Sequence, residues 1–214
     1  MQDSKGLRPY QTILTTGESE ILINKSRFLG YCLQVSSEQE AQQALARIRK
    51  RHYDARHCCY AFRLAEGGVA RSSDDGEPSG TAGAPILSVL NGAQLENVLC
   101  AVVRYFGGVL LGTGGLVRAY GRAATEAIGN ARIAKMQLCA LISVDVSYPS
   151  YRALEPMIRA KGYDCQPDFG ERVKLMLTLP SEEADAFSAA ITERTDGAAI
   201  VEILGEILKP CPIL

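Results

Sequence analysis

A continuously apolar segment followed by a glycine-rich run constrains the fold of this chain most. Residues 98–103 are all apolar, and six glycines follow from Gly107 to Gly121. A strand that is apolar at every position is typical of the buried centre of a sheet. After the glycines, helical spacing predicts a helix over residues 113–128 that buries Leu116, Ala119, Tyr120, Ala123 and Ala127.

The rest of the first part alternates strands with helices. Strands are predicted at residues 20–24, 28–35, 57–64 and 97–105. Ser37 and Glu40 have the spacing of a capping box, which predicts a helix with an apolar face formed by Ala41, Ala44, Leu45 and Ile48. Residues 66–68 predict a hairpin turn, residues 72–83 a shaped loop, and residues 85–90 a short helix.

The second part has the element order βαββαβ, which is that of a ferredoxin-like module. Strands are predicted at residues 138–148, 162–165, 173–179 and 199–207. One helix is expected from Ser150 with an interruption at Pro156, and another is expected with Ser181 as its cap. Residues 167–172 are predicted to connect two strands, and the tail at residues 210–212 is predicted to be loose. At 214 residues two domains are expected, and we place them at 1–136 and 137–214.

The charge differs between these two parts. Residues 1–136 hold 16 Lys and Arg against 12 Asp and Glu, whereas residues 137–214 hold 7 against 12. We therefore expect any contact with a polyanion to belong to the first part.

The cysteines and the N-terminus predict a cytoplasmic protein. The seven cysteines are odd in number and none has C-x-x-C spacing, so we expect reduced, structural thiols and no zinc site. No apolar stretch approaches the roughly 20 residues that a bilayer span needs. Residues 1–9 lack the apolar core of a secretory signal.

The glycine-rich run has two interpretations. Its glycines can turn backbone N–H groups toward an anion at a helix start, with Arg118 and Arg122 on one helical face beside the same phosphate. Alternatively, small residues here permit close helix–sheet packing. The run matches neither a P-loop nor a full dinucleotide fingerprint, so both interpretations stay open.

Two further segments carry chemistry-bearing residues. Asp74, Asp75 and Glu77 are weak candidates for holding a hard cation, but the same residues are ordinary turn formers, which is the favoured interpretation. A basic run from Arg47 to His57 holds more Lys and Arg residues than the C-terminal end of a helix requires. For His57 a structural role is favoured over general-base work, because no nucleophile stands beside it in sequence.

Taken together, these segments resemble the IMPACT/YigZ family. The matching motifs are Lys25-Ser26-Arg27-Phe28, Asp54-Ala55-Arg56-His57, residues 73–83, and Arg104-Tyr105-Phe106-Gly107-Gly108 continuing to Gly121. Ala84 departs from the pattern, since the family usually has lysine there. The chain resembles the bacterial type, without the extra N-terminal interaction domain of eukaryotic members.

The resemblance implies an α+β protein of two domains. The first would have the fold of ribosomal protein S5's second domain, and the second would be ferredoxin-like, similar to the fifth domain of elongation factor G. Eukaryotic members are linked to control of translation, and no catalytic residue set carries over to this chain.

We therefore expect a non-enzymatic, RNA- or ribosome-associated factor in translation, with no cofactor, no membrane contact and no DNA-specific motif. No protein partner can be named. The alternative is a phosphate-handling, small-molecule kinase-like enzyme that uses Mg²⁺. The candidate nucleic-acid or phosphate-binding residues are Arg27, Arg56, His57, Arg104, Gly107, Gly108, Thr113, Gly114, Gly115, Arg118 and Arg122.

Overall fold

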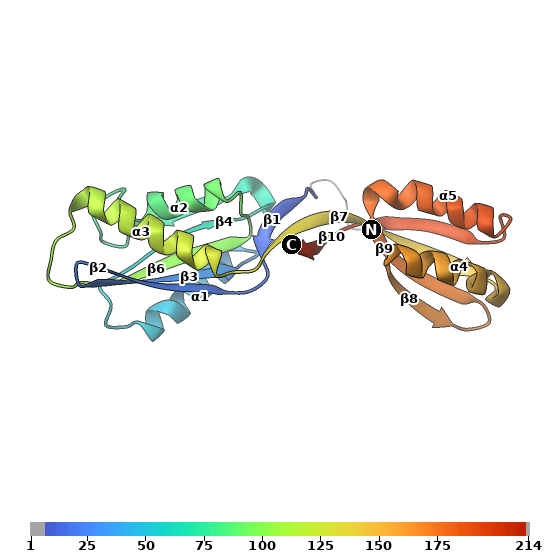
Figure 1. Ribbon diagram of the computed structural model, residues 1–214, viewed down its shortest axis with the longest axis horizontal. Helices are drawn as coiled ribbons and strands as arrows, with labels where there is room; N and C mark the ends of the chain where they lie inside the picture. The colour runs from blue at the N-terminus through green and yellow to red at the C-terminus, as the bar shows by residue number, and fades with distance from the viewer. Residues whose placement is uncertain (1–6, 213–214) are drawn as a thin grey trace. The chain divides into compact units, whose positions relative to one another are not determined.

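The computed structural model describes residues 7–212 as two compact units, one built on Tyr10–Lys135 and the other on Met136–Pro210. Both units combine strands with helices (Figure 1), so the predicted α+β class is confirmed. None of the helices among the described residues has the length and apolar content needed to cross a membrane.

A five-stranded sheet with the order β2-β3-β6-β4-β5 supports the first unit. The neighbouring strands are antiparallel. Their bounds are β2 (Gly17–Ile23), β3 (Ser26–Gln34), β4 (His57–Arg63), β5 (Ala70–Ser73) and β6 (Val98–Tyr105). Every residue of β6 except Tyr105 is buried, as the apolar run predicts for a central strand.

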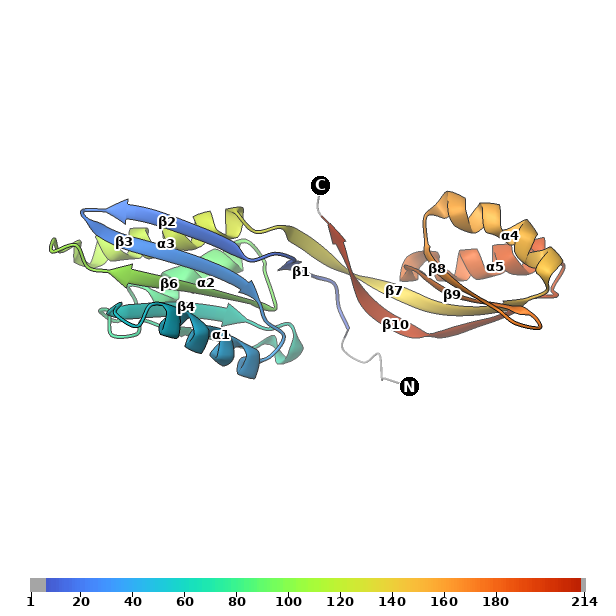
Figure 2. The ribbon, with the colours of Figure 1, turned by 90° about the horizontal axis from the view of Figure 1, so that it is seen from below.

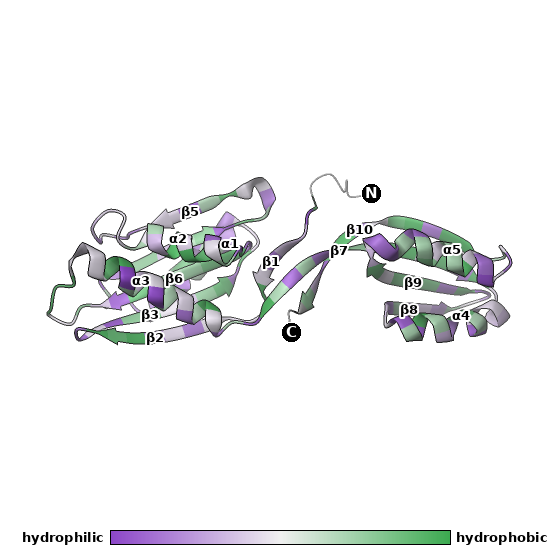
Figure 3. Ribbon diagram, turned by 45° about the horizontal axis from the view of Figure 1, so that its top comes forward, coloured by the Kyte–Doolittle hydropathy of each residue, from purple (hydrophilic) through white to green (hydrophobic). Residues whose placement is uncertain are grey.

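Helices cover both faces of this sheet (Figure 2). α1 (Glu38–Arg51) packs on one face, and α2 (Gly83–Gly92) and α3 (Gly112–Gly129) pack on the other. Ser37 caps α1 by accepting the Glu40 N–H, and the predicted apolar face of this helix is buried. Hydrophobic and hydrophilic residues alternate along α3 (Figure 3), and all five residues predicted to be buried there are buried.

The second unit follows the predicted order βαββαβ. Its elements are β7 (Ile133–Val146), α4 (Tyr148–Lys161), β8 (Asp164–Phe169), β9 (Val173–Pro180), α5 (Ala184–Arg194) and β10 (Ile200–Pro212). β9 lies between β7 and β8, and β10 pairs with β7. The core contains residues from both helices, among them Leu154, Ile158, Phe187 and Ile191.

Several local predictions were wrong in this unit. α4 begins after Ser147, whose hydroxyl accepts the Ser150 N–H, and it continues through Pro156 without interruption. β8 extends over Pro167, which is tolerated because β8 is an edge strand.

Two further predictions differ from the structure, and two strands had not been predicted. A short 3₁₀ turn, Ser181–Glu183, precedes α5, so Ser181 does not cap that helix. The tail predicted to be loose belongs to β10. The short strands β1 (Tyr10–Ile13) and β5 had not been predicted.

Candidate functional site

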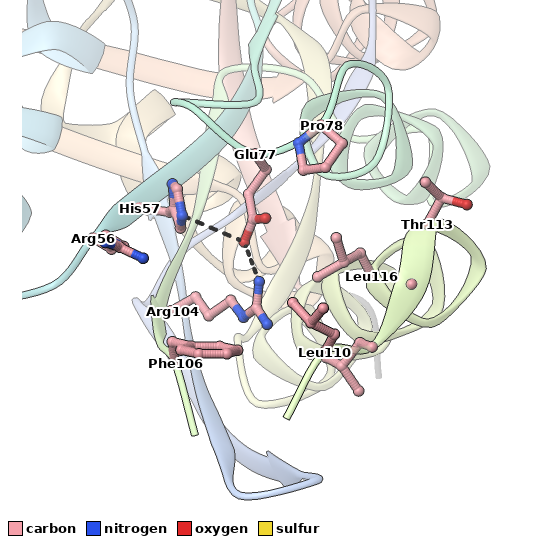
Figure 4. A pocket seen from close by; sticks show the side chains of 11 residues that line it. Arg56, His57, Glu77, Pro78, Arg104, Phe106, Leu110, Thr113 and Leu116 are labelled. Atoms are coloured by element: carbon pink, nitrogen blue, oxygen red, sulfur yellow. Dashed lines mark hydrogen bonds and ion pairs between the residues drawn. The ribbon is translucent and has the colours of Figure 1, made fainter. Parts of the chain in front are cut away.

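A pocket of about 390 Å³ opens in the first unit, where the loop before α2 meets the loop before α3. Arg56 and His57 lie on one side of it, and Leu110 and Thr113 lie on the opposite side (Figure 4). Its lining combines ionisable side chains with an apolar wall: Arg56, His57, Glu77, Pro78, Arg104, Phe106, Leu110, Leu111, Gly112, Thr113 and Leu116.

The register of the sheet brings the polar side of the pocket together. Arg104 of β6 lies opposite Phe28 of β3 on one side and opposite His57 of β4 on the other. Directly opposed residues of neighbouring strands point to the same face of a sheet. These three side chains therefore form one row on the face that α2 and α3 cover.

Glu77 joins this row to the loop and to α3. Its Oε1 accepts hydrogen bonds from Arg104 Nη1 and from the Tyr120 hydroxyl, both at 2.7 Å. His57 Nε2 lies 4.0 Å from the same oxygen. The Glu77 and Arg104 side chains are only 4% and 7% exposed, so this is a buried ion pair in which each charge depends on the other.

The Arg104 guanidinium lies over two aromatic rings. Its guanidinium carbon lies 5.4 Å from the ring centroids of both Phe28 and Phe106. Phe28 is fully buried, whereas Phe106 is 45% exposed. Within the part of the chain that the structure describes, the buried Arg104 Nε has no hydrogen-bond partner.

His57 donates a hydrogen bond from its Nδ1. Its Nδ1 lies 2.8 Å from the backbone oxygen of Asp75, and a carbonyl oxygen only accepts hydrogen bonds. Nδ1 therefore carries the proton, and Nε2 faces Glu77.

Asp74 and Asp75 hold the loop in shape. The Asp74 carboxylate accepts the N–H groups of Gly80, Ala82 and Gly83. Burial opposes the charged form of Asp74, but these three donors outweigh it and hold the pKa of Asp74 below its usual value. The Asp75 carboxylate accepts the Cys58 N–H and pairs with Arg49.

The three candidate metal ligands are thus engaged with protein groups. Over residues 7–212, no cluster of three or more His, Cys, Asp or Glu side chains is arranged to hold a metal ion. Asp74 and Asp75 thus take part in the hydrogen bonds of this loop, whereas Glu77 takes part in the buried ion pair.

The glycines of this run fall into two groups. One packs closely against neighbouring backbone, and the other lies at or before the start of α3. A Cβ on Gly107 would lie 2.0 Å from the Lys25 carbonyl carbon, and the Gly107 N–H donates to Ser26 Oγ, so this glycine serves close packing. Gly108 and Gly112 have left-handed backbone conformations. Gly114 and Gly115 lie in the first turn of α3, where the N-cap residue Leu111 supplies no side-chain hydrogen bond.

Comparisons with known protein families agree with the sequence motifs that resemble the IMPACT/YigZ family. The Impact N-terminal domain matches residues 24–128, and a domain of unknown function, DUF1949, matches residues 144–198. IMPACT family member YvyE of Bacillus subtilis is 36% identical over 92% of this chain and 91% of its own length. An IMPACT family member of Thermus thermophilus is 38% identical over 85% of this chain and 99% of its own length.

The chain belongs to the IMPACT family. A solved crystal structure of a hypothetical protein is also similar, with a TM-score of 0.60 and 28% identity, covering 93% of this chain and 98% of the other. All the residues that line the pocket fall within the stretch matched by the Impact N-terminal domain.

In this IMPACT family member, four of the predicted nucleic-acid or phosphate-binding residues line the pocket, namely Arg56, His57, Arg104 and Thr113. The others lie outside its lining. Arg27 pairs with Glu20, and Arg122 pairs with Glu126. Arg118 is exposed on α3 and does not reach the pocket, so Arg118 and Arg122 do not converge on one anion site there.

Sequence reasoning missed Phe106, Leu110 and Tyr120 as site residues. Phe106 stood in the recognised motif, directly after the strand, and that position was the available signal. Tyr120 was correctly predicted to be buried, but its bond to Glu77 joins residues 43 positions apart and leaves no local pattern.

Proposed function

We propose that this IMPACT family member binds RNA through the unit built on Tyr10–Lys135. The observation that carries the proposal is Arg56, which has no ion-pair partner among the described residues and lies on the pocket with the exposed ring of Phe106. An unpaired cation beside an exposed aromatic ring matches the two parts of a nucleotide. The cation attracts the phosphate, and the ring stacks on a base.

The start of α3 supports the same conclusion. The first N–H groups of a helix have no partner within the helix and carry partial positive charge. In α3 they lie beside the pocket, because Gly112 and Thr113 belong to its lining. The excess of Lys and Arg in residues 1–136 extends this attraction over a larger surface.

A role in translation, at the ribosome and in the cytoplasm, is the finer part of the proposal. It rests on the family resemblance. We assign the first unit to the fold of ribosomal protein S5's second domain. The second unit fits the ferredoxin-like class because β9 lies between β7 and β8 in an order βαββαβ.

The kinase-like alternative has less support. It requires carboxylates that are free to hold a magnesium–nucleotide complex. Asp74 and Asp75 instead hold the loop, and Glu77 neutralises the buried Arg104. We therefore favour binding over phosphoryl transfer.

Fluorescence anisotropy with an unstructured, labelled RNA tests the proposal on the full chain. Affinity should fall as salt rises, and Arg56→Ala should reduce the slope of log K against log salt by about 0.7, the value for one contact to a single strand. Phe106→Ala should cost about 1–3 kcal/mol through lost stacking.

Arg152→Ala is the matched control, since Arg152 is an exposed arginine on α4 in the other unit. Absence of binding at low salt, or equal losses in Arg56→Ala and Arg152→Ala, would refute RNA binding at this pocket. Co-sedimentation with ribosomes tests the translation role separately, and protein left entirely in the supernatant would contradict it.

A further inference from the structure

We infer that the pocket receives a terminal nucleotide that bears a phosphate monoester, as at a phosphorylated RNA end, and not an internal segment of the strand. This inference rests on the proposed RNA binding and names what the pocket recognises. The ligand chemistry is a nucleoside monophosphate, either as the end of a strand or as a free mononucleotide.

The size of the pocket supports one terminal group. Its volume of about 390 Å³ is near the lower end of the range for small-ligand sites, roughly 300–1,000 Å³. Glu77 and Arg104 line its polar side with side chains that are only 4% and 7% exposed.

The donors favour a monoester over a diester. Arg56, Thr113 and the N–H groups at the start of α3 all border the pocket. A phosphate monoester offers three terminal oxygens and a charge of about −1.5 to −2, whereas an internal diester has one charge and two free oxygens. More of these donors can therefore be satisfied by a chain end.

Arg104 supplies an observation independent of the helix terminus. Its side chain is 7% exposed, and its Nε has no hydrogen-bond partner among residues 7–212, although the guanidinium remains charged. A buried N–H without an acceptor is unfavourable, and a ligand oxygen in the pocket can become that acceptor. Phe106 covers the guanidinium on its more exposed side, so we expect ligand binding to move this ring.

The test compares two labelled RNAs of one sequence, one with a 5′-phosphate and one with a 5′-hydroxyl, against the full chain. The phosphorylated strand should bind about tenfold more tightly, the effect of one charge-assisted hydrogen bond. Adenosine 5′-monophosphate, adenosine 3′-monophosphate and adenosine serve as competitors. Both phosphates should compete and adenosine should not.

Arg56→Ala removes the exposed cation that lines the pocket and should reduce the preference for the phosphorylated strand to less than threefold. Arg152→Ala should leave the preference unchanged. In ¹⁵N-labelled protein, the Arg104 Nε–H resonance should shift when adenosine 5′-monophosphate is added. This measurement needs no Arg104 variant, which would disturb folding.

The outcomes separate this inference from the proposed function. Equal, salt-dependent binding of both strands would overturn the terminal-phosphate inference and leave RNA binding standing. Failure of both strands together with binding of the mononucleotide would refute RNA binding and keep the pocket assignment. An unmoved Arg104 resonance at saturating mononucleotide would overturn the role given to Arg104.

Discussion

Replacing Glu77 by alanine should destabilise the first unit by about 3–5 kcal/mol. The loss follows from the burial of its partner, because the Arg104 side chain is 7% exposed and would keep its charge without a counter-ion. Tyr120 would also lose the acceptor of its hydroxyl. Glu77→Gln keeps an oxygen acceptor but removes the charge, so an intermediate loss of about 1.5–3 kcal/mol is expected.

A matched surface pair provides the control. Glu126 also pairs with an arginine, Arg122, but that arginine is 64% exposed. Glu126→Ala should therefore cost no more than about 0.5 kcal/mol. The variant Glu77→Leu with Arg104→Met removes both charges and should recover part of the loss, since replacing a whole buried pair is much less costly than breaking it.

Urea unfolding followed by far-UV circular dichroism measures these losses, since the chain has no tryptophan. Hydrogen exchange over β4 and β6 assigns them to the first unit. A loss for Glu77→Ala equal to that of Glu126→Ala would refute the argument. So would a double variant whose loss is the sum of the losses from Glu77→Leu and Arg104→Met alone, because the two charges would then act independently.

Three further predictions concern the loops and the thiols. The pKa of Asp74 is lowered in the folded state, so this carboxylate stabilises the fold above the unfolded carboxyl pKa of about 4. That stabilisation is lost as the pH falls through the folded pKa. Asp74→Asn should therefore flatten the fall of Tm below about pH 4. Gly107→Ala should lower the free energy of unfolding in urea by about 1–3 kcal/mol or more. A Cβ at Gly114 meets nothing nearer than 3.6 Å, so Gly114→Ala should change this free energy by less than about 1 kcal/mol. Exposed Cys211 should react first with a thiol reagent in the native protein. Chelators should leave Tm unchanged. Cys100→Ser should lower the free energy of unfolding by about 1–3 kcal/mol, because the Cys100 side chain is fully buried.

The predictable parts of the fold are those fixed by local interactions. The β6 strand follows from six adjacent apolar residues, and α1 follows from the Ser37 cap with an apolar face at helical spacing. Prolines misled the prediction in the second unit. Pro156 lies inside α4, and Pro167 lies in an edge strand that does not require its missing N–H.

The candidate site was less predictable because its contacts are long-range. Arg104 was selected as a phosphate ligand from its charge, yet its Nη1 is bound to Glu77, which lies 27 positions earlier. Only the register of β3, β4 and β6 reveals that Arg104 lies between Phe28 and His57. Local sequence patterns do not specify such a register between distant strands.

Gly107 connects the packing of the sheet to the pocket, although it does not line the pocket. Its N–H donates to Ser26 Oγ, and its Cα approaches the Lys25 backbone too closely for any side chain. This contact fixes the chain directly beside Phe106, whose ring stacks on the Arg104 guanidinium. A larger residue at Gly107 would displace that backbone and, with it, the ring that forms part of the pocket wall. The glycine that serves packing is therefore also required for the geometry of the proposed binding site, so the two interpretations of the glycine-rich run are complementary.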